Sequence, residues 1–169
     1  MLKFRIPLIL QCLIFLIPLN IYVIGDWMGS GIQALFFRYQ QTNMGNSLIF
    51  LNREMGFVLN GILTGKTAYA SVLWCVGVVF ICIAMLVIVY TYLQEEQSLI
   101  RNAAFLNAGG ALSFTLAVII QYGIFLNGPS GIAIPIGIPV ILGVAYWQYQ
   151  WNPATGEDDE QADEEPGSS

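Results

Sequence analysis

Four long apolar stretches dominate the chain, and only short polar segments separate the last three. The stretches cover residues 6–24, 68–93, 103–126 and 131–151. A helix needs roughly 20 consecutive apolar residues to cross a bilayer, because unpaired backbone amides are costly in hydrocarbon. All four stretches meet that length, so the pattern predicts an all-α integral membrane protein with about four transmembrane helices in a small bundle.

Aromatic and turn-forming residues lie near the ends of these stretches. Trp74 lies near one end of the second stretch and Tyr90 and Tyr92 lie at the other, as in the aromatic belts found at both membrane interfaces. Residues 127–130, Asn-Gly-Pro-Ser, separate the third stretch from the fourth and favour a tight helical hairpin. The first stretch is followed by no small-x-small cleavage site, so we interpret it as an uncleaved signal anchor.

The segment between the first two stretches, residues 25–67, is too polar to be a fifth span. It contains apolar residues at spacings of three and four, which would share one face of a helix. These residues are Leu48, Leu51, Met55, Val58 and Ile62. A shorter apolar run from Ile32 to Tyr39 suggests another helical piece. We expect amphipathic helical segments here, lying on the membrane surface or packing over the mouth of the bundle.

Composition agrees with a membrane protein and separates off the end of the chain. Hydrophobic residues make up 56% of the sequence and charged residues 10%, whereas soluble domains average about 25% charged residues. The net charge of −5 comes from residues 157–165, which hold seven of the eleven acidic residues. We therefore expect a membrane domain over residues 1–151 and a disordered acidic tail over residues 152–169.

The orientation follows from basic residues that flank the first stretch. Lys3 and Arg5 precede it and Asp26 follows it. Because basic residues favour the cytoplasmic side, we expect the N-terminus in the cytoplasm of a cell-membrane protein. An even number of spans then places the acidic tail on the same side.

Several kinds of chemistry have no support in the sequence. Histidine is absent, which excludes Ser-His catalysis and histidine-based haem, zinc or iron sites within this chain. No nucleotide-binding glycine motif and no basic cluster for nucleic acid occurs. We expect no enzyme activity, no cofactor and no metal site, since an activity would have to come from four residues of the 25–67 segment: Asp26, Arg38, Arg53 and Glu54.

Small and polar residues repeat along two of the stretches at helical spacings. Small residues let helices approach closely in lipid, where no hydrophobic force drives association. The residues predicted to pack helix against helix are Ala70, Gly77 and Ala84 in the second stretch and Asn107, Ala111 and Thr115 in the third.

Neutral polar residues and two prolines suggest a second role for the apolar stretches. Pro135 and Pro139 each remove a backbone donor from the fourth stretch, and transporters use broken helices at binding sites. Gln11, Asn20 and Gln121, together with Asn107 and these prolines, could line a polar path. A simpler interpretation of the prolines is a kinked first helical turn near the interface.

Two hypotheses about function remain. The first is a non-catalytic accessory or scaffold subunit that packs against another membrane protein in the bilayer. The alternative is a small transport or permeation protein, which would act as a homo-oligomer because four helices leave little room for a pore.

Overall fold

A computed structural model describes residues 2–25, 28–94 and 99–151, and that part of the chain forms five helices and six strands. The helices are α1 (Leu2–Leu16), α2 (Leu51–Leu59), α3 (Gly65–Gln94), α4 (Ile100–Tyr122) and α5 (Gly137–Gln150). The strands are β1 (Asn20–Ile24), β2 (Gly29–Gln33), β3 (Phe37–Thr42), β4 (Gly45–Phe50), β5 (Asn127–Gly128) and β6 (Gly131–Ile134). The fold is therefore mixed, with helices and a sheet in one unit.

The strands form one antiparallel sheet in the order β4-β3-β2-β1-β6-β5. Strands β1 to β4 follow one another along the chain as a meander. Strand β6, from the far end of the sequence, pairs with the free side of β1, so that Ile21 lies opposite Ile134. Tyr22 and Ala133 form the next pair in this register. The sheet thus joins the segment after α1 to the segment before α5.

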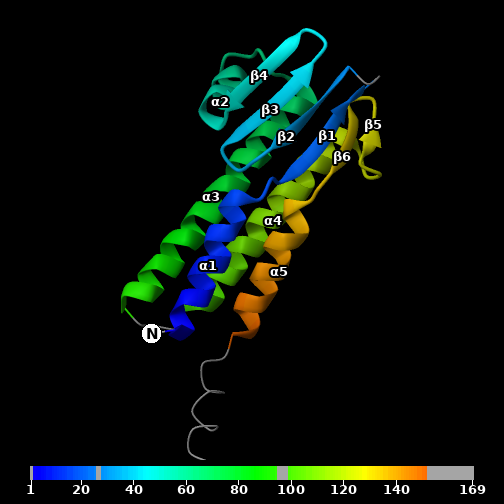
Figure 1. The fold of residues 1–169 in the computed structure, drawn as a ribbon. Helices are drawn as coiled ribbons and strands as arrows, with labels where there is room; N and C mark the ends of the chain where they lie inside the picture. Colours follow the sequence, from blue (N-terminus) through cyan, green and yellow to red (C-terminus); the bar gives the residue numbers. More distant parts are fainter. Residues whose placement is uncertain (1, 26–27, 95–98, 152–169) are drawn as a thin grey trace, which may run out of the picture.

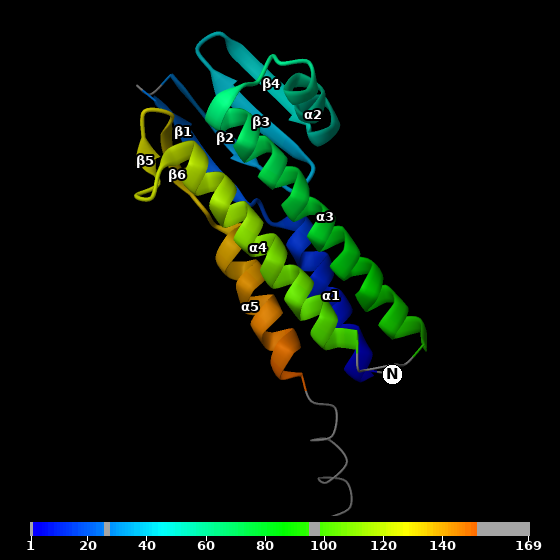
Figure 2. The same ribbon diagram turned by 180° about the vertical axis from the view of Figure 1, so that it is seen from behind.

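The four longer helices lie side by side, and the sheet stands beyond the ends of α1 and α5, where it faces the upper parts of α3 and α4 (Figure 1). Helix α4 packs between α3 and α5, and α1 contacts both α3 and α5. The view from behind shows α3, α4 and α5 covering the opposite side of the bundle (Figure 2). The start of α1 and the end of α5 lie together at the end away from the sheet.

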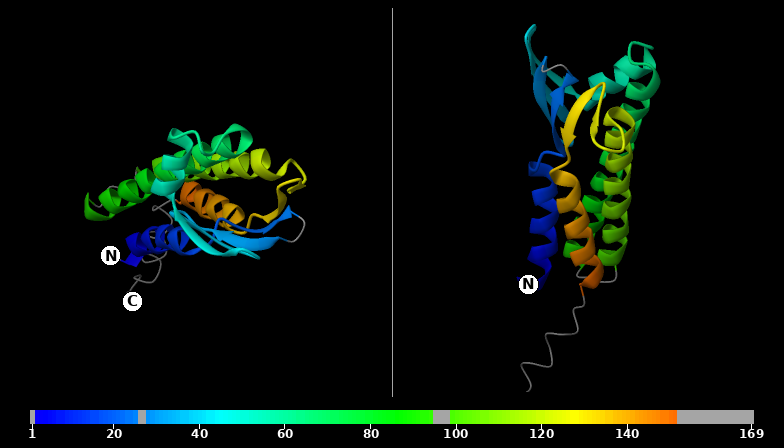
Figure 3. Two further views of the ribbon diagram at one scale, coloured as in Figure 1. Left: turned by 90° about the horizontal axis from the view of Figure 1, so that it is seen from above. Right: turned by 90° about the vertical axis from the view of Figure 1, so that its right-hand side faces the viewer.

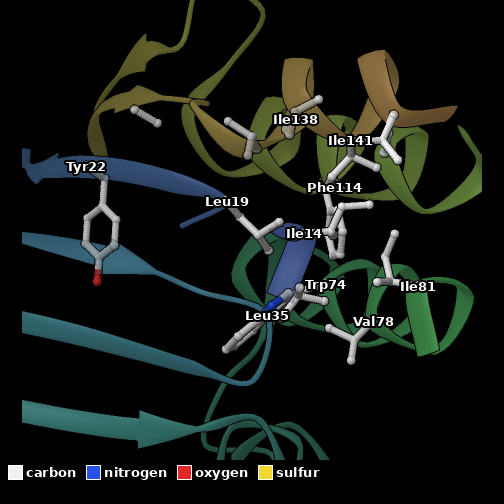
Figure 4. Close-up of a cluster of buried hydrophobic side chains, with 14 of the residues drawn as sticks. Ile14, Leu19, Tyr22, Leu35, Trp74, Val78, Ile81, Phe114, Ile138 and Ile141 are labelled. Atoms are coloured by element: carbon white, nitrogen blue, oxygen red, sulfur yellow. The ribbon is translucent and has the colours of Figure 1, made fainter. Parts of the chain in front are cut away.

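The main core lies where the helices meet the inner face of the sheet. Figure 4 shows Leu19, Phe114 and Ile138 converging from the α1–β1 connection, α4 and α5. Trp74 of α3 is 1% exposed and belongs to this core. The prediction that Trp74 lies in an interfacial belt is therefore wrong.

The expected all-α bundle of four spans is wrong as well. The six-stranded sheet contradicts the fold class, and only α3 and α4 among the described helices are long and apolar enough to cross a membrane. Helix α3 covers the whole second stretch, residues 68–93, and α4 covers most of the third, residues 103–126.

The first and fourth stretches each contain a helix and a strand. Helix α1 ends at Leu16 and residues 20–24 form β1, while the fourth stretch begins with β6 and becomes helical only at Gly137. An apolar run can be a helix or a buried strand, and length alone does not distinguish them when the two follow each other. Residues 127–130 form β5 and the turn that leads into β6, rather than a turn between two helices.

The segment 25–67 also differs from the amphipathic helices expected there. Within its described residues, the run from Ile32 to Tyr39 spans the end of β2 and the start of β3, and residues 45–50 form β4. Helix α2 is confined to Leu51–Leu59. The spacing that indicated one long helix came from a strand followed directly by a short helix. The predicted tail, residues 152–169, lies outside the described residues.

Candidate functional site

A row of polar side chains lies on the inner face of the sheet, next to the helices. The register places Asn20 of β1 opposite Gln33 of β2, and Gln33 opposite Arg38 of β3. Side chains directly opposite each other share one face of an antiparallel pair. The Asn20 amide nitrogen donates to Gln33 Oε1 at 3.2 Å. These three residues line a cavity of about 30 Å³ whose other walls come mainly from α3 and α4.

Glu54 of α2 provides a buried carboxylate in this cavity wall. It is 0% exposed. Arg38 Nη2 donates to Glu54 Oε1 at 2.6 Å and to Oε2 at 2.7 Å, and Ser71 Oγ of α3 donates to Oε1 at 2.8 Å. Buried charges require such compensation. These three residues, which we call the Glu54 cluster, tie β3, α2 and α3 together.

Four polar atoms of the cavity wall lack a hydrogen-bond partner within residues 2–25, 28–94 and 99–151. They are Asn20 Oδ1, Gln121 Oε1, Arg38 Nε and Trp74 Nε1. Two of these atoms accept hydrogen bonds and two donate, as a water molecule does. A volume near 30 Å³ accommodates roughly one to three water molecules. The cavity therefore suits water or a ligand of similar size, and it is too small for a nucleotide, a sugar or a lipid.

Tyr22 lies on the same inner face, two positions along β1 from Asn20, with its ring 6.3 Å from that of Tyr122 on α4. It is 4% exposed, and its ring covers the Cα position of Gly31 on β2. Burial raises the pKa of Tyr22 to about 12, an effect that nearby Arg38 opposes and Glu54 adds to. The phenol is therefore neutral at physiological pH, and its hydroxyl has no hydrogen-bond partner among the described residues.

A second polar cluster lies inside the helical bundle. Gln11 of α1, Asn107 of α4 and Gln148 of α5 are at most 1% exposed. Asn107 Nδ2 donates to Gln11 Oε1 and to Gln148 Oε1, both at 2.8 Å. Gln11 Nε2 donates to Asn107 Oδ1 and Gln148 Nε2 donates to Gln11 Oε1, both at 3.1 Å. This amide triad connects three helices through neutral groups whose partners are one another.

The predicted packing residues lie largely inside the bundle. Ala70, Gly77 and Ala84 are buried on α3, and a Cβ on Gly77 would collide with the ring of Phe114. On α4, Asn107 and Ala111 are fully buried, whereas Thr115 is half-buried and donates to the Ala111 carbonyl oxygen at 2.8 Å. Helices α3 and α4 therefore approach closely at Gly77.

The residues of the predicted polar path fall into separate places. Asn20 and Gln121 line the cavity, whereas Gln11 belongs to the amide triad. Pro135 lies between β6 and α5, and Pro139 is exposed in the first turn of α5, where a missing amide hydrogen is tolerated. Apolar core side chains, including Leu19, Phe114 and Ile138, line the cavity on the bundle side (Figure 4). The structure thus does not bring these five residues together.

An enzyme activity would have to come from four residues of the 25–67 segment, and the structure does not place these residues in one site either. Arg38 and Glu54 bind each other in the Glu54 cluster. Arg53 lies on the exposed side of α2 with its guanidinium 5.5 Å from the ring centre of Phe57. Asp26 lies outside the described residues. Among the described residues, no group of three or more histidine, cysteine or acidic side chains could hold a metal ion.

Sequence reasoning missed Gln148 and Ser71. Gln148 lies in the run Tyr146-Trp-Gln-Tyr-Gln150, whose aromatic residues suggested only an interfacial anchor. The available signal was the scarcity of side-chain amides within the apolar stretches, since a buried amide needs a partner. Ser71 carried no signal of its own, because serine is common in helices that pack closely.

No known family model matches this chain, and no curated protein matches it at a significant level.

Proposed function

We propose that this chain is a membrane-embedded, non-catalytic accessory or scaffold protein. One observation carries the proposal: the outward side chains of the bundle helices are large and apolar. Exposed positions include Ile9 and Leu16 on α1, Val79, Ile83, Leu86 and Leu93 on α3, Phe105, Leu112 and Leu116 on α4, and Leu142 and Tyr146 on α5. Lipid, rather than water, is the solvent that such a surface fits.

Moving one large aliphatic side chain out of water contributes roughly 1.5–3 kcal/mol. Leu86 and Leu93 of α3 are 68% and 69% exposed, and Leu112 of α4 is 61% exposed. Soluble monomers rarely leave apolar patches of more than a few hundred Å² in contact with water. The exposed surface therefore favours a bilayer around α3 and α4, with α1 and α5 beside them in the same layer.

The two polar clusters support a structural use of the buried polar groups. The carboxylate of Glu54 accepts three hydrogen bonds, and the members of the amide triad bind one another. Side chains that are saturated in this way hold elements in place rather than wait for a substrate. We therefore favour a scaffold over an enzyme.

The orientation remains a prediction from the basic residues near the N-terminus. The start of α1 and the end of α5 share one end of the bundle, opposite the sheet (Figure 1). If Lys3 and Arg5 lie in the cytoplasm, the end of α5 lies on that side too, and the sheet with α2 faces the outside. The sheet and α2 would then form the platform that meets a partner.

The test has two stages. Alkaline carbonate should leave the protein in the membrane pellet, and its release into the supernatant would refute membrane embedding. Gentle extraction followed by native mass analysis should then reveal a larger membrane protein in fixed stoichiometry. A homo-oligomer without such a partner would contradict the accessory role and would favour the permeation alternative, which flux measurements in liposomes would then test.

A further inference from the structure

The outer face of the sheet carries a row of apolar side chains across five strands. The register places Ile134 opposite Ile21, Ile21 opposite Ile32, Ile32 opposite Tyr39, and Tyr39 opposite Leu48. Directly opposed residues of an antiparallel sheet point to the same side. We call these five residues the sheet row. Its members on β6 and β4, Ile134 and Leu48, are 59% and 48% exposed.

The outer face is uncharged and changes character along the strands. Arg38 is the one charged residue in the six described strands, and it binds Glu54 on the inner side. Beyond the sheet row, toward the end away from α1 and α5, the outer positions of β2, β3 and β4 are polar: Ser30, Gln41 and Asn46. On β1 and β6 the same row stays apolar, with Val23 and Ile132, so the polar part of the outer face is confined to β2, β3 and β4.

The sheet row continues the exposed apolar surface of two helices. Strand β1 begins shortly after α1 ends, and β6 leads into α5 after two residues. The rings of Phe15 on α1 and Phe36, between β2 and β3, lie 5.9 Å apart. Figure 3 shows the sheet standing directly above α1 and α5 in the side view. An apolar surface thus runs without interruption from these helices onto the sheet.

The length of this surface matches a bilayer only when the sheet row is included. Helix α5 has 14 residues and α1 has 15, which correspond to about 21 and 22 Å at 1.5 Å per residue. The hydrocarbon core of a bilayer is about 30 Å thick. Residues 134 and 135 add roughly 7 Å to α5 at 3.3 Å per residue, because Ile136 already has a helical backbone conformation. The apolar surface beside α5 therefore reaches about 28 Å at Ile134, close to the thickness of the hydrocarbon core.

We propose that the sheet row rests against lipid at the membrane interface, so that the bilayer surface is the partner of this part of the sheet. The inference rests on the proposed membrane embedding. Tyr39 suits an interface, where tyrosine places its ring among lipid chains and its hydroxyl in water. A charged protein surface would find no complementary charge on this face. The sheet is thus partly submerged, and the polar outer positions of β2, β3 and β4 stand in water.

The experiment measures the surroundings of single spin labels on the full chain in liposomes. Cys12, Cys75 and Cys82 are first replaced by alanine, and one cysteine is introduced as Leu48→Cys, with Asn46→Cys as the matched control on the same face of β4. Oxygen concentrates in lipid, whereas a water-soluble nickel chelate stays outside. The label at position 48 should collide several-fold more with oxygen and less with the chelate than the label at position 46.

A third label distinguishes this inference from the proposed function. Leu86→Cys reports on the outer face of α3, far from the sheet. A lipid signal at position 86 with a water signal at position 48 would overturn the inference and leave the membrane embedding intact. A water signal at position 86 would overturn both.

Occupation of the sheet row by protein would also be visible. Low access of both oxygen and chelate at position 48, with spin–spin broadening between copies, would mean that a second copy covers the row, and the inference would be wrong. Ile32→Cys with Ser30→Cys as its control repeats the comparison on β2, so that a variant that fails to fold does not decide the result.

Discussion

Removing the Glu54 carboxylate should be among the most damaging single changes to the junction between sheet and helices. In Glu54→Ala, Arg38 and Ser71 lose their partner and remain in the cavity wall. Breaking a buried ion pair costs about 3–5 kcal/mol. The Arg38 side chain is 20% exposed, so water compensates it in part and we expect about 3 kcal/mol. For a chain of this size, that corresponds to a fall in Tm of roughly 6–12 °C.

The assay is thermal unfolding in one detergent, with far-UV circular dichroism as the signal. It is applied to each variant of a double-mutant cycle. Arg38→Ala alone leaves the buried carboxylate unpaired and should be at least as damaging. The double variant Arg38→Ala/Glu54→Ala removes both charges, and it should be clearly more stable than the sum of the two losses predicts. A cycle without coupling would refute the claim that the two side chains depend on each other.

Arg53→Ala is the matched control. Arg53 precedes Glu54 on α2, but its side chain is on the exposed side and contacts the ring of Phe57. Losing such a contact costs about 0.5–1 kcal/mol. If Glu54→Ala and Arg53→Ala lowered Tm equally, burial of the ion pair would not be the source of the effect.

Three further changes test other parts of the structure. The pKa of Tyr22 is raised from 10.0 to about 12, so its contribution to stability is full below pH 10 and is lost as the pH rises from 10 to 12; Tyr22→Phe should remove that alkaline loss from the pH dependence of Tm. Gly77→Ala should cost about 1–3 kcal/mol in thermal unfolding because its methyl group meets Phe114. Gly109→Ala on α4, with neighbours at 3.7 Å, should be tolerated, and equal losses would contradict the close contact. Asn107→Leu should cost about 2 kcal/mol for the hydrogen bonds of the amide triad, and an unchanged Tm would contradict their contribution.

The long helices were predictable because composition alone defines them. Residues 68–93 hold no charged side chain. So long an apolar run without a polar turn is typical of a helix, because strands are shorter and are separated by polar turns. The ends of the chain were harder. Residues 20–24, Asn-Ile-Tyr-Val-Ile, continue an apolar run begun by α1, and only their β-branched character indicates a strand.

The sheet itself could not be derived from local patterns. The pairing that joins the two ends of the chain places Ile21 opposite Ile134, and nothing in either segment identifies the other. The same reason hid the candidate site. Arg38 and Glu54 were recognisable as rare ionisable residues, but their contact requires β3 and α2 to fold back on each other. Gln11 and Asn107 were noticed as polar, whereas Gln148 became meaningful only once α5 lay beside α1 and α4.

The pairing of β1 with β6 also means that one side of β1 stays unpaired until late in synthesis of the chain. The meander β1 to β4 is made early, and β6 emerges only after α3 and α4. Until then β1 is an edge strand with unpaired backbone groups, which readily pair with other chains. A product that stopped after α4 would keep that edge open, whereas completion of the chain closes it with the same segment that begins α5. Strand β1 therefore has neighbours on both sides only once β6 has been made.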